Sequence, residues 1–146
     1  PAGPMQPDRC LHVCMLGDTG TGHSEFLRAY RSSAGGEVPD AQIENIVAVV
    51  ELDGEAWCVR FTDNVGQKRF DSLRHTALHI SHVVLLCFAV DDQESLQGVI
   101  NNWLPILQAT QSEAPYFLVG LKADARVRGS ERPLVDVDSC RELALR

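Results

Sequence analysis

Short runs of hydrophobic residues, separated by polar turns, predict the strands of this chain. Residues 11–16 are mostly apolar and end at Gly17, which indicates a strand that enters a turn. Residues 83–90 are continuously apolar and end at two aspartates, and such a run is typical of a strand buried on both faces of a parallel sheet. Residues 116–121 form another apolar strand.

Two further runs predict a hairpin. Residues 46–52 and 56–61 are rich in β-branched and aromatic residues and flank the dipeptide Asp53-Gly54. Asp-Gly between two runs of this kind is a strong signal for a tight turn that joins two antiparallel strands.

Helices are predicted where hydrophobic residues recur every three or four positions. Residues 24–31 have this spacing in Phe26, Leu27 and Tyr30. Residues 95–107 have a longer apolar face, but we expect Pro105 to kink or end that helix, because proline cannot donate a backbone hydrogen bond.

The order of these elements predicts the fold class. A last helix begins at residue 137, with Asp138 or Ser139 as its N-cap. Strands that alternate with helices are typical of a doubly wound α/β sheet, which binds ligands at the carboxyl ends of its strands. Residues 1–9 are rich in proline and predict a flexible lead-in, and residues 10–146 predict one domain.

Composition and charge exclude several classes of function. The formal net charge is −7 and the pI is about 5.1, which argues against a nucleic-acid-binding surface and against broad attraction to anionic lipid. No apolar run approaches the ~20 residues of a membrane span. The cysteines favour reduced thiols, and on that ground we expect a cytoplasmic protein.

The five cysteines favour reduced thiols over a disulfide framework, because their number is odd and several lie within apolar runs. Cys10 and Cys14 have a spacing that a metal pair could use. They lie along one predicted strand, however, and no second pair of cysteines or histidines has ligand spacing.

The first candidate site follows the first strand. The stretch from Gly17 to Ser24, GDTGTGHS, fits the phosphate-loop pattern G-x-x-x-x-G-K-[ST] except that His23 replaces the lysine. Glycines let the backbone turn its N–H groups toward phosphate oxygens, and the hydroxyl of Ser24 would ligate Mg²⁺. An ordinary glycine turn between a strand and a helix is the alternative.

Two more candidate sites follow predicted strands. After residue 61 come Asp63, which could hold Mg²⁺, Gly66, whose N–H could reach a γ-phosphate, and Gln67, which could orient an attacking water. After residue 121 come Lys122 and Asp124, and this aspartate could accept the paired N–H donors of a guanine edge. Each stretch alone also suits a solvated turn.

Together these residues resemble the Ras superfamily of small GTPases, and most closely the Rho and Rac family. The best match is residues 70–107, with the family's Trp-x-Pro pattern at Trp103-Leu104-Pro105. The resemblance implies a P-loop small-GTPase fold with a mostly parallel sheet and one antiparallel hairpin strand. It implies two switch loops for effectors and regulators, at residues 34–45 and 66–79.

The resemblance also assigns roles to the candidate residues. Ser24 and Asp63 would bind Mg²⁺, and Gln67 would position water for GTP hydrolysis. The nucleotide itself would contact the residues of the three candidate loops: Gly17, Thr19, Gly20, Thr21, Gly22, His23, Ser24, Gly66, Lys122 and Asp124.

Several positions depart from the family pattern. His23 offers a shorter arm and fewer donors than lysine, and Thr19 stands where the family usually has glycine, so that it crowds the γ-phosphate. The first switch shows Asp40 and Ala41 after its proline instead of the Mg²⁺-binding threonine. Leu121 replaces the polar residue that braces the guanine pocket.

The printed chain ends at Arg146, before the last strand and helix that the resemblance implies, so we expect a C-terminally incomplete domain. Membrane association through a C-terminus beyond it stays open. The sequence predicts an atypical Rho-like switch that binds GTP or GDP and Mg²⁺ with reduced affinity and strongly impaired hydrolysis. A pseudoGTPase module that binds protein partners without nucleotide is the alternative.

Overall fold

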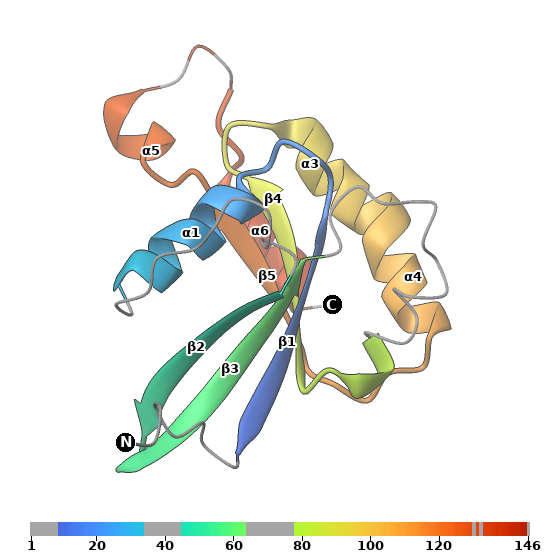
Figure 1. Cartoon of the computed structure of the whole chain (residues 1–146). Coiled ribbons are helices and arrows are strands. Elements are labelled where there is room, and N and C mark those ends of the chain that lie inside the picture. Colours follow the sequence, from blue (N-terminus) through green and yellow to red (C-terminus); the bar gives the residue numbers. More distant parts are fainter. Residues whose placement is uncertain (1–8, 34–44, 64–77, 130, 132, 146) are drawn as a thin grey trace.

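A five-stranded sheet forms the centre of the computed structural model, which describes residues 9–33, 45–63, 78–129, 131 and 133–145 (Figure 1). The strand order is β2-β3-β1-β4-β5, and only the β2–β3 pair is antiparallel. The predicted mostly parallel sheet with one antiparallel hairpin strand is thus confirmed. The strands are β1 (Cys10–Gly17), β2 (Asn45–Leu52), β3 (Glu55–Asp63), β4 (Val83–Ala89) and β5 (Tyr116–Leu121).

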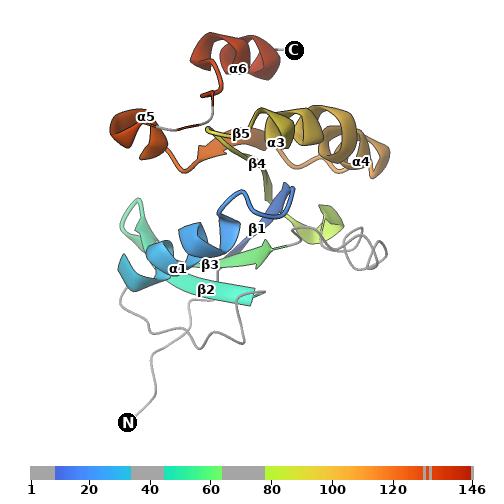
Figure 2. The same cartoon turned by 90° about the horizontal axis from the view of Figure 1, so that it is seen from above.

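Helices cover both faces of this sheet, as Figure 2 shows from above. Helix α1 (His23–Ser33) lies on one face. The opposite face carries a continuous helical stretch made of α3 (Gln93–Gly98), η3 (Val99–Trp103) and α4 (Leu104–Ala109), and also α6 (Val137–Ala144). A short helix α5 (Ala125–Arg128) lies between β5 and α6. None of the helices in the described ranges is long and apolar enough to cross a membrane.

The predicted hairpin is confirmed at its turn. Strands β2 and β3 pair from Asn45↔Thr62 to Leu52↔Glu55, so that only Asp53 and Gly54 lie between them. Both turn residues have positive φ, 52° and 78°, which is the conformation that a two-residue hairpin turn requires and that Asp-Gly adopts readily.

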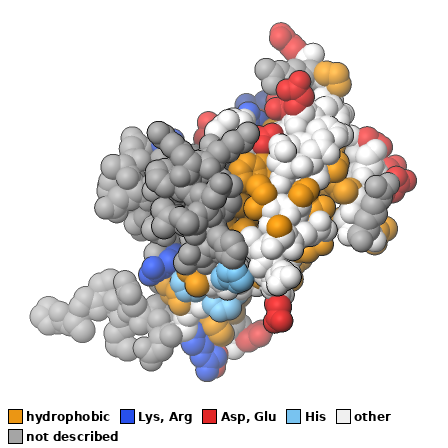
Figure 3. Space-filling model, turned by 90° about the vertical axis from the view of Figure 1, so that its right-hand side faces the viewer, with side chains coloured by type: hydrophobic (Ala, Val, Ile, Leu, Met, Phe, Trp, Pro, Cys, Tyr) orange, Lys and Arg blue, Asp and Glu red, His pale blue; other side chains and the backbone are white. Residues whose placement is uncertain are grey.

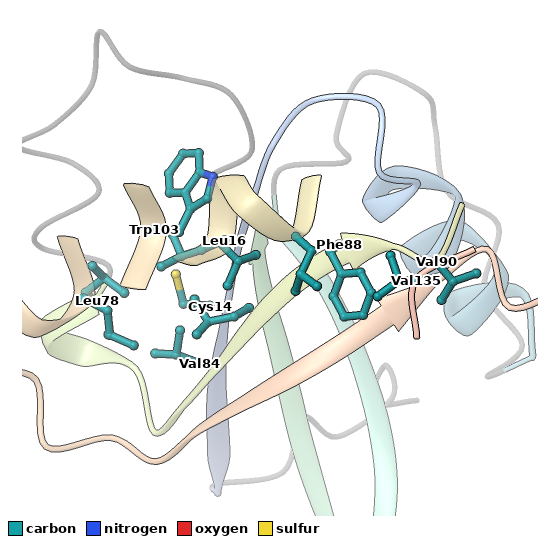
Figure 4. Close-up of a cluster of buried hydrophobic side chains, with 12 residues drawn as sticks. Cys14, Leu16, Leu78, Val84, Phe88, Val90, Trp103 and Val135 are labelled. Atoms are coloured by element: carbon teal, nitrogen blue, oxygen red, sulfur yellow. The ribbon is translucent and has the colours of Figure 1, made fainter. Parts of the chain in front are cut away.

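Two hydrophobic clusters, one on each face, hold the layers together. The cluster beneath α3, η3 and α4 contains side chains of β1 and β4 and the ring of Trp103, as Figure 4 shows. The cluster on the other face joins Leu27 of α1 to residues of β1, β3, β4 and β5. Strand β4 contributes to both clusters, which confirms the expected burial of its two faces.

Around Pro105, where a kink or an end was expected, the helix that follows β4 changes its helical type just before the proline. It does not end there but continues to Ala109, because the five residues before α4 form a π-helical segment. In that segment the N–H of Leu104 donates to the carbonyl of Val99, five residues earlier. Pro105 lies in the first turn of α4 and has no backbone N–H to donate. The wider π-helical turn before it lets the helix continue without that hydrogen bond.

The expected N-cap of the last helix was wrong by two or three residues. Asp136, not Asp138 or Ser139, caps α6, and its side chain accepts a hydrogen bond from the N–H of Ser139. Both predicted caps lie inside the first turn, where the acidic Asp138 favours the positive end of the helix dipole.

Several predicted features lie outside the described residues. They include nearly all of the switch loops 34–45 and 66–79, the lead-in up to residue 8, and the residues Asp40, Ala41, Gly66 and Gln67.

Candidate functional site

The strands that precede the three candidate loops all end at the same end of the sheet. The loops follow β1, β3 and β5, three strands that run parallel with β4. Met15, two residues before the end of β1, is in register with Asp63, and Ala89 at the end of β4 is in register with Leu121. The fold therefore places the carboxyl ends of these strands side by side, as doubly wound sheets do around a ligand.

The loop after β1 contains two glycines in the left-handed conformation. Gly20 and Gly22 have φ angles of 82° and 96°, which residues with a Cβ rarely adopt. Among the described residues, apart from its two chain neighbours, no atom lies within 4 Å of the place where a Cβ of Gly20 would stand, and Gly20 is exposed. The carbonyl of Gly22 accepts the N–H of Phe26 at 3.0 Å and starts helix α1. An open glycine turn at a helix N-terminus suits a phosphate group.

His23 occupies the interior of this loop. Its side chain is only 2% exposed, and its Nδ1 lies 2.6 Å from the hydroxyl oxygen of Thr21, which is itself buried. The Thr21 hydroxyl donates to the carbonyl of Asp18 at 3.1 Å, so it has a partner on both sides. A Cβ at Gly17 would stand 2.7 Å from Nε2 of His23. Glycine at that position therefore leaves the room that the imidazole fills.

The imidazole of His23 is neutral at pH 7. Burial lowers its pKa from the ordinary 6.5 to about 4, although a hydrogen bond with the Leu16 backbone and the negative charge of Asp18 act in the opposite direction. The position that carries a permanent positive charge in the phosphate-loop pattern therefore carries none here.

The side chain of Asp18 links the loop after β1 to the helical stretch α3–η3. The sequence did not indicate this contact. The Oδ1 atom of Asp18 accepts a 2.7 Å hydrogen bond from Nε1 of Trp103, which lies 85 positions away in η3. A side chain at Gly98 would collide with the same carboxylate. No pattern in the sequence relates these residues, because the contact depends on how η3 packs on the sheet.

Lys122 joins the third candidate loop to the first. Its backbone has a φ of 58°, in the left-handed region, directly after β5. Carbons of its side chain, Cγ and Cε, lie 3.5 Å from the place of a Cβ at Gly22. The aliphatic part of Lys122 therefore packs over the phosphate-type turn, and the structure brings these two predicted loops together.

Asp124 is exposed and lies 3.8 Å from the guanidinium of Arg128, one turn along α5. An exposed pair of this kind contributes little to stability, so the carboxylate can exchange Arg128 for another partner. Leu121, in contrast, is 6% exposed and belongs to the cluster beneath α1. It points into the core and offers no polar group to this end of the sheet.

The two predicted metal ligands are placed by their backbones. Ser24 is the second residue of α1, and Asp63 is the last residue of β3, the neighbour of β1. Thr19 is exposed at the tip of the loop. The described residues contain no cluster of three or more His, Cys, Asp or Glu side chains that could hold a metal ion. Cys10 and Cys14 therefore belong to no such cluster among the described residues.

Comparison with known proteins decides the family. The family model described as the Ras family matches residues 12–145, almost the whole chain. The chain belongs to the Ras family. Curated relatives that are 32–36% identical to it are Rho proteins, so it is a Rho-like small GTPase by descent, and the resemblance inferred from the sequence is confirmed.

Three of these relatives come from two fungi. The GTP-binding protein rho3 of Schizosaccharomyces pombe is 32% identical over 125 residues, which are 85% of this chain and 60% of that protein. The GTP-binding protein rho5 of the same organism is 37% identical over 115 residues, 78% of this chain and 58% of that protein. The GTP-binding protein RHO1 of Candida albicans is 34% identical over 125 residues, 85% of this chain and 62% of that protein.

The Rho-like chain thus spans about three fifths of the length of the curated relatives that it matches.

The surface of the protein agrees with its acidic composition on the face that Figure 3 shows. Acidic side chains lie at several places around that face, and hydrophobic side chains gather across its middle. The described Lys and Arg side chains seen there lie apart from one another.

Proposed function

We propose that this Rho-like protein is a guanine-nucleotide switch with a weakened phosphate site and little hydrolysis. The observation that carries the proposal is the buried, neutral imidazole of His23 at the position of the phosphate-loop lysine. The glycine turn around it would still bind phosphate through backbone N–H groups, but without the positive charge.

Retained features of the site support nucleotide binding. Gly20 is open to solvent, Lys122 packs over Gly22, and the carboxylate of Asp124 is available at the next loop. In this proposal Asp124 accepts the N–H donors of guanine, and the stem of Lys122 lies along the ring. Ser24 and Asp63 would hold Mg²⁺, which supplies positive charge to the β- and γ-phosphates when it is bound.

The contacts to nucleotide that are missing from this site determine the affinity that we expect for GDP and GTP. A missing charged contact to a polyphosphate costs about 1.5–3 kcal/mol, which corresponds to roughly 10–150-fold in affinity. Leu121 adds no polar brace for the base, because its side chain is buried in the core. We therefore expect dissociation constants for GDP and GTP in the micromolar range or weaker.

Hydrolysis should be weaker than binding. Thr19 puts a side chain where a γ-phosphate, the predicted catalytic Gln67 and any arginine supplied by a partner would need space. The exposure of Thr19 at the loop tip supports this expectation. We propose effectors and regulators that bind through residues 34–45 and 66–79, and a cytoplasmic location.

A second candidate function is a pseudoGTPase module that binds partners without nucleotide. The contact between His23 and Thr21 favours it, because a loop whose interior is filled and hydrogen-bonded does not need a ligand to be stable. The same fold would then present a Rho-like surface to its partners at all times.

Analysis of co-purified nucleotide tests the two functions. Protein purified in Mg²⁺ is denatured, and the released small molecules are separated by chromatography. Stoichiometric GDP or GTP would contradict the pseudoGTPase module and the predicted weak affinity.

Thermal unfolding completes the test when no nucleotide is released. Addition of millimolar GTP and Mg²⁺ should raise the Tm of a weak binder, because a ligand at a concentration well above its Kd stabilises the folded state. An unchanged Tm would contradict the switch and leave the pseudoGTPase module as the function.

A further inference from the structure

Two cysteines that are distant in sequence lie side by side in the sheet. Cys10 is the first residue of β1, Cys58 is the fourth of β3, and their Cα atoms are register partners in the parallel β1–β3 pair. The N–H of Cys58 donates to the carbonyl of Arg9 at 2.9 Å, which fixes this register. Register partners project to the same face of a sheet, so the two thiols face each other.

The two thiols differ in how solvent reaches them. Cys10 is half-buried, whereas Cys58 is only 5% exposed. Burial and a hydrogen bond with the side chain of Cys10 raise the pKa of Cys58, and the charge of Arg60 acts in the opposite direction. Cys10 is therefore the thiol that an oxidant meets first, and Cys58 is a resolving thiol already in contact with it.

The other cysteines lack this arrangement. All five cysteines lie in the described part of the chain, and no disulfide joins them there. Cys14 and Cys87 are fully buried, and Cys140 is on α6, which packs against β5 and the hydrophobic cluster beneath α3. The Cys10–Cys58 pair is the one that combines partial access with a neighbouring thiol.

We propose that Cys10 and Cys58 form a reversible disulfide when the protein meets a peroxide. This assigns an oxidative modification site to the β1–β3 pair near the start of β1, away from the carboxyl ends of β1, β3 and β5 that precede the three candidate loops. It does not rest on nucleotide binding.

The chemistry balances with hydrogen peroxide as the oxidant. The thiolate of Cys10 attacks one peroxide oxygen, the O–O bond breaks, and Cys10 becomes a sulfenic acid while hydroxide leaves and is protonated to water. The sulfur of Cys58 then attacks the sulfenic sulfur, its proton goes to the departing hydroxide, and a second water leaves. Two thiols are oxidised by two electrons in total, and one peroxide is reduced.

The sheet makes this bond possible and easy to reduce. Neighbouring strands lie about 4.7–4.9 Å apart, within the range of Cα separations that disulfides span, about 4.4–6.8 Å. The two Cβ atoms of such a pair must approach somewhat more closely than strands normally hold them. Because strained disulfides are reduced readily, we expect a labile bond and not a permanent structural one.

Peptide mapping of the oxidised protein tests the proposal. The folded protein is treated with hydrogen peroxide, its remaining thiols are blocked, and it is digested with trypsin without reduction. Peptide 10–28 contains Cys10 and Cys14, and peptide 32–60 contains Cys58. We expect these peptides to be linked with a mass about 2 Da below their sum, fragment ions to place the link on Cys10, and dithiothreitol to release it.

Variants identify the residues. Cys10→Ser should abolish the link and leave Cys58 unmodified, because the buried thiol is not reached directly, whereas the control Cys140→Ser should form the link as the wild type does. A link that survives in Cys10→Ser, or Cys10 oxidised to a sulfinic acid without a link, would overturn the proposal. The map of the wild-type protein decides this even if a variant fails to fold.

Discussion

At the scale of single residues, His23 determines the character of the candidate site. A lysine at this position would reach toward the phosphates, but the imidazole turns inward and contacts Thr21 and the backbone of Leu16. The substitution therefore removes a charge and also fills the interior of the loop. A sequence shows the first effect but not the second, because the direction of the ring depends on the space that Gly17 leaves.

The buried His23 should make stability depend on pH. The unfolded chain binds a proton at this residue near pH 6.5, and the folded chain only near pH 4. The contribution of His23 is therefore complete above pH 6.5 and falls as the pH drops toward 4, by about 3 kcal/mol in all. Urea unfolding of the wild type and of His23→Gln at several pH values measures this difference.

The control for this series is His79→Gln, which replaces an exposed histidine. The free energy of unfolding of that variant should follow the pH dependence of the wild type. If His23→Gln also does so between pH 7 and 4, the imidazole of His23 is not buried in its neutral form.

Trp103 should stabilise the loop through Asp18. Trp103→Phe keeps most of the buried ring but removes the 2.7 Å hydrogen bond to the carboxylate, which should cost about 1.5–3 kcal/mol. Trp57→Phe is the matched control, because that ring lies against the Arg9 guanidinium and not against the loop. Equal losses in the free energy of unfolding for both variants would show that the Asp18 contact contributes nothing specific.

At the scale of elements, the N-cap residue Asp92 stabilises helix α3. Asp92 accepts hydrogen bonds from the N–H groups of Glu94 at 3.0 Å and Ser95 at 3.4 Å, which satisfies two donors at the start of the helix. Asp92→Ala should therefore lower the free energy of unfolding by about 1 kcal/mol. The neighbouring Asp91→Ala serves as the control in thermal or urea unfolding, and a loss as large in that variant would contradict the cap.

The elements were largely predictable because each strand is a bounded apolar run and the hairpin has a specific turn. The existence of every predicted strand is confirmed, and so is the turn at Asp53-Gly54. The π-helical segment and the cap at Asp136 were not predictable. Both depend on how the chain packs after α3 and before α6, and local sequence propensity does not contain that information.

At the scale of the whole molecule, the fold brings together residues that sequence reasoning could only treat as separate turns. The parallel strands place the ends of β1, β3 and β5 at one end of the sheet, and Lys122 packs over Gly22 across 100 positions of sequence. The alternation of strands and helices predicts this meeting. It does not predict the tie from Asp18 to Trp103, which depends on tertiary packing.

Variants of Thr19 and His23 should separate the effect of Thr19 on GTP hydrolysis from the effect of His23 on nucleotide binding. Thr19→Gly alone should change GTP turnover little, because the loop still lacks its charge. His23→Lys combined with Thr19→Gly should hydrolyse GTP faster than His23→Lys alone, since the space for the γ-phosphate is restored only where nucleotide binds. Single-turnover assays with Mg²⁺ measure these rates, and equal rates in the double and single variants would show that Thr19 does not limit the reaction.

The central claim is that the buried imidazole of His23 weakens the phosphate site. Equilibrium titration of nucleotide-free protein with a fluorescent GDP analogue in Mg²⁺ tests it most directly. The wild type should bind in the micromolar range or more weakly, and His23→Lys should bind at least about tenfold more tightly, the effect of regaining one charged contact. Gln108→Lys, which adds the same charge on the exposed side of α4, should leave the affinity unchanged. Tight binding by the wild type, or no gain in His23→Lys, would contradict the account.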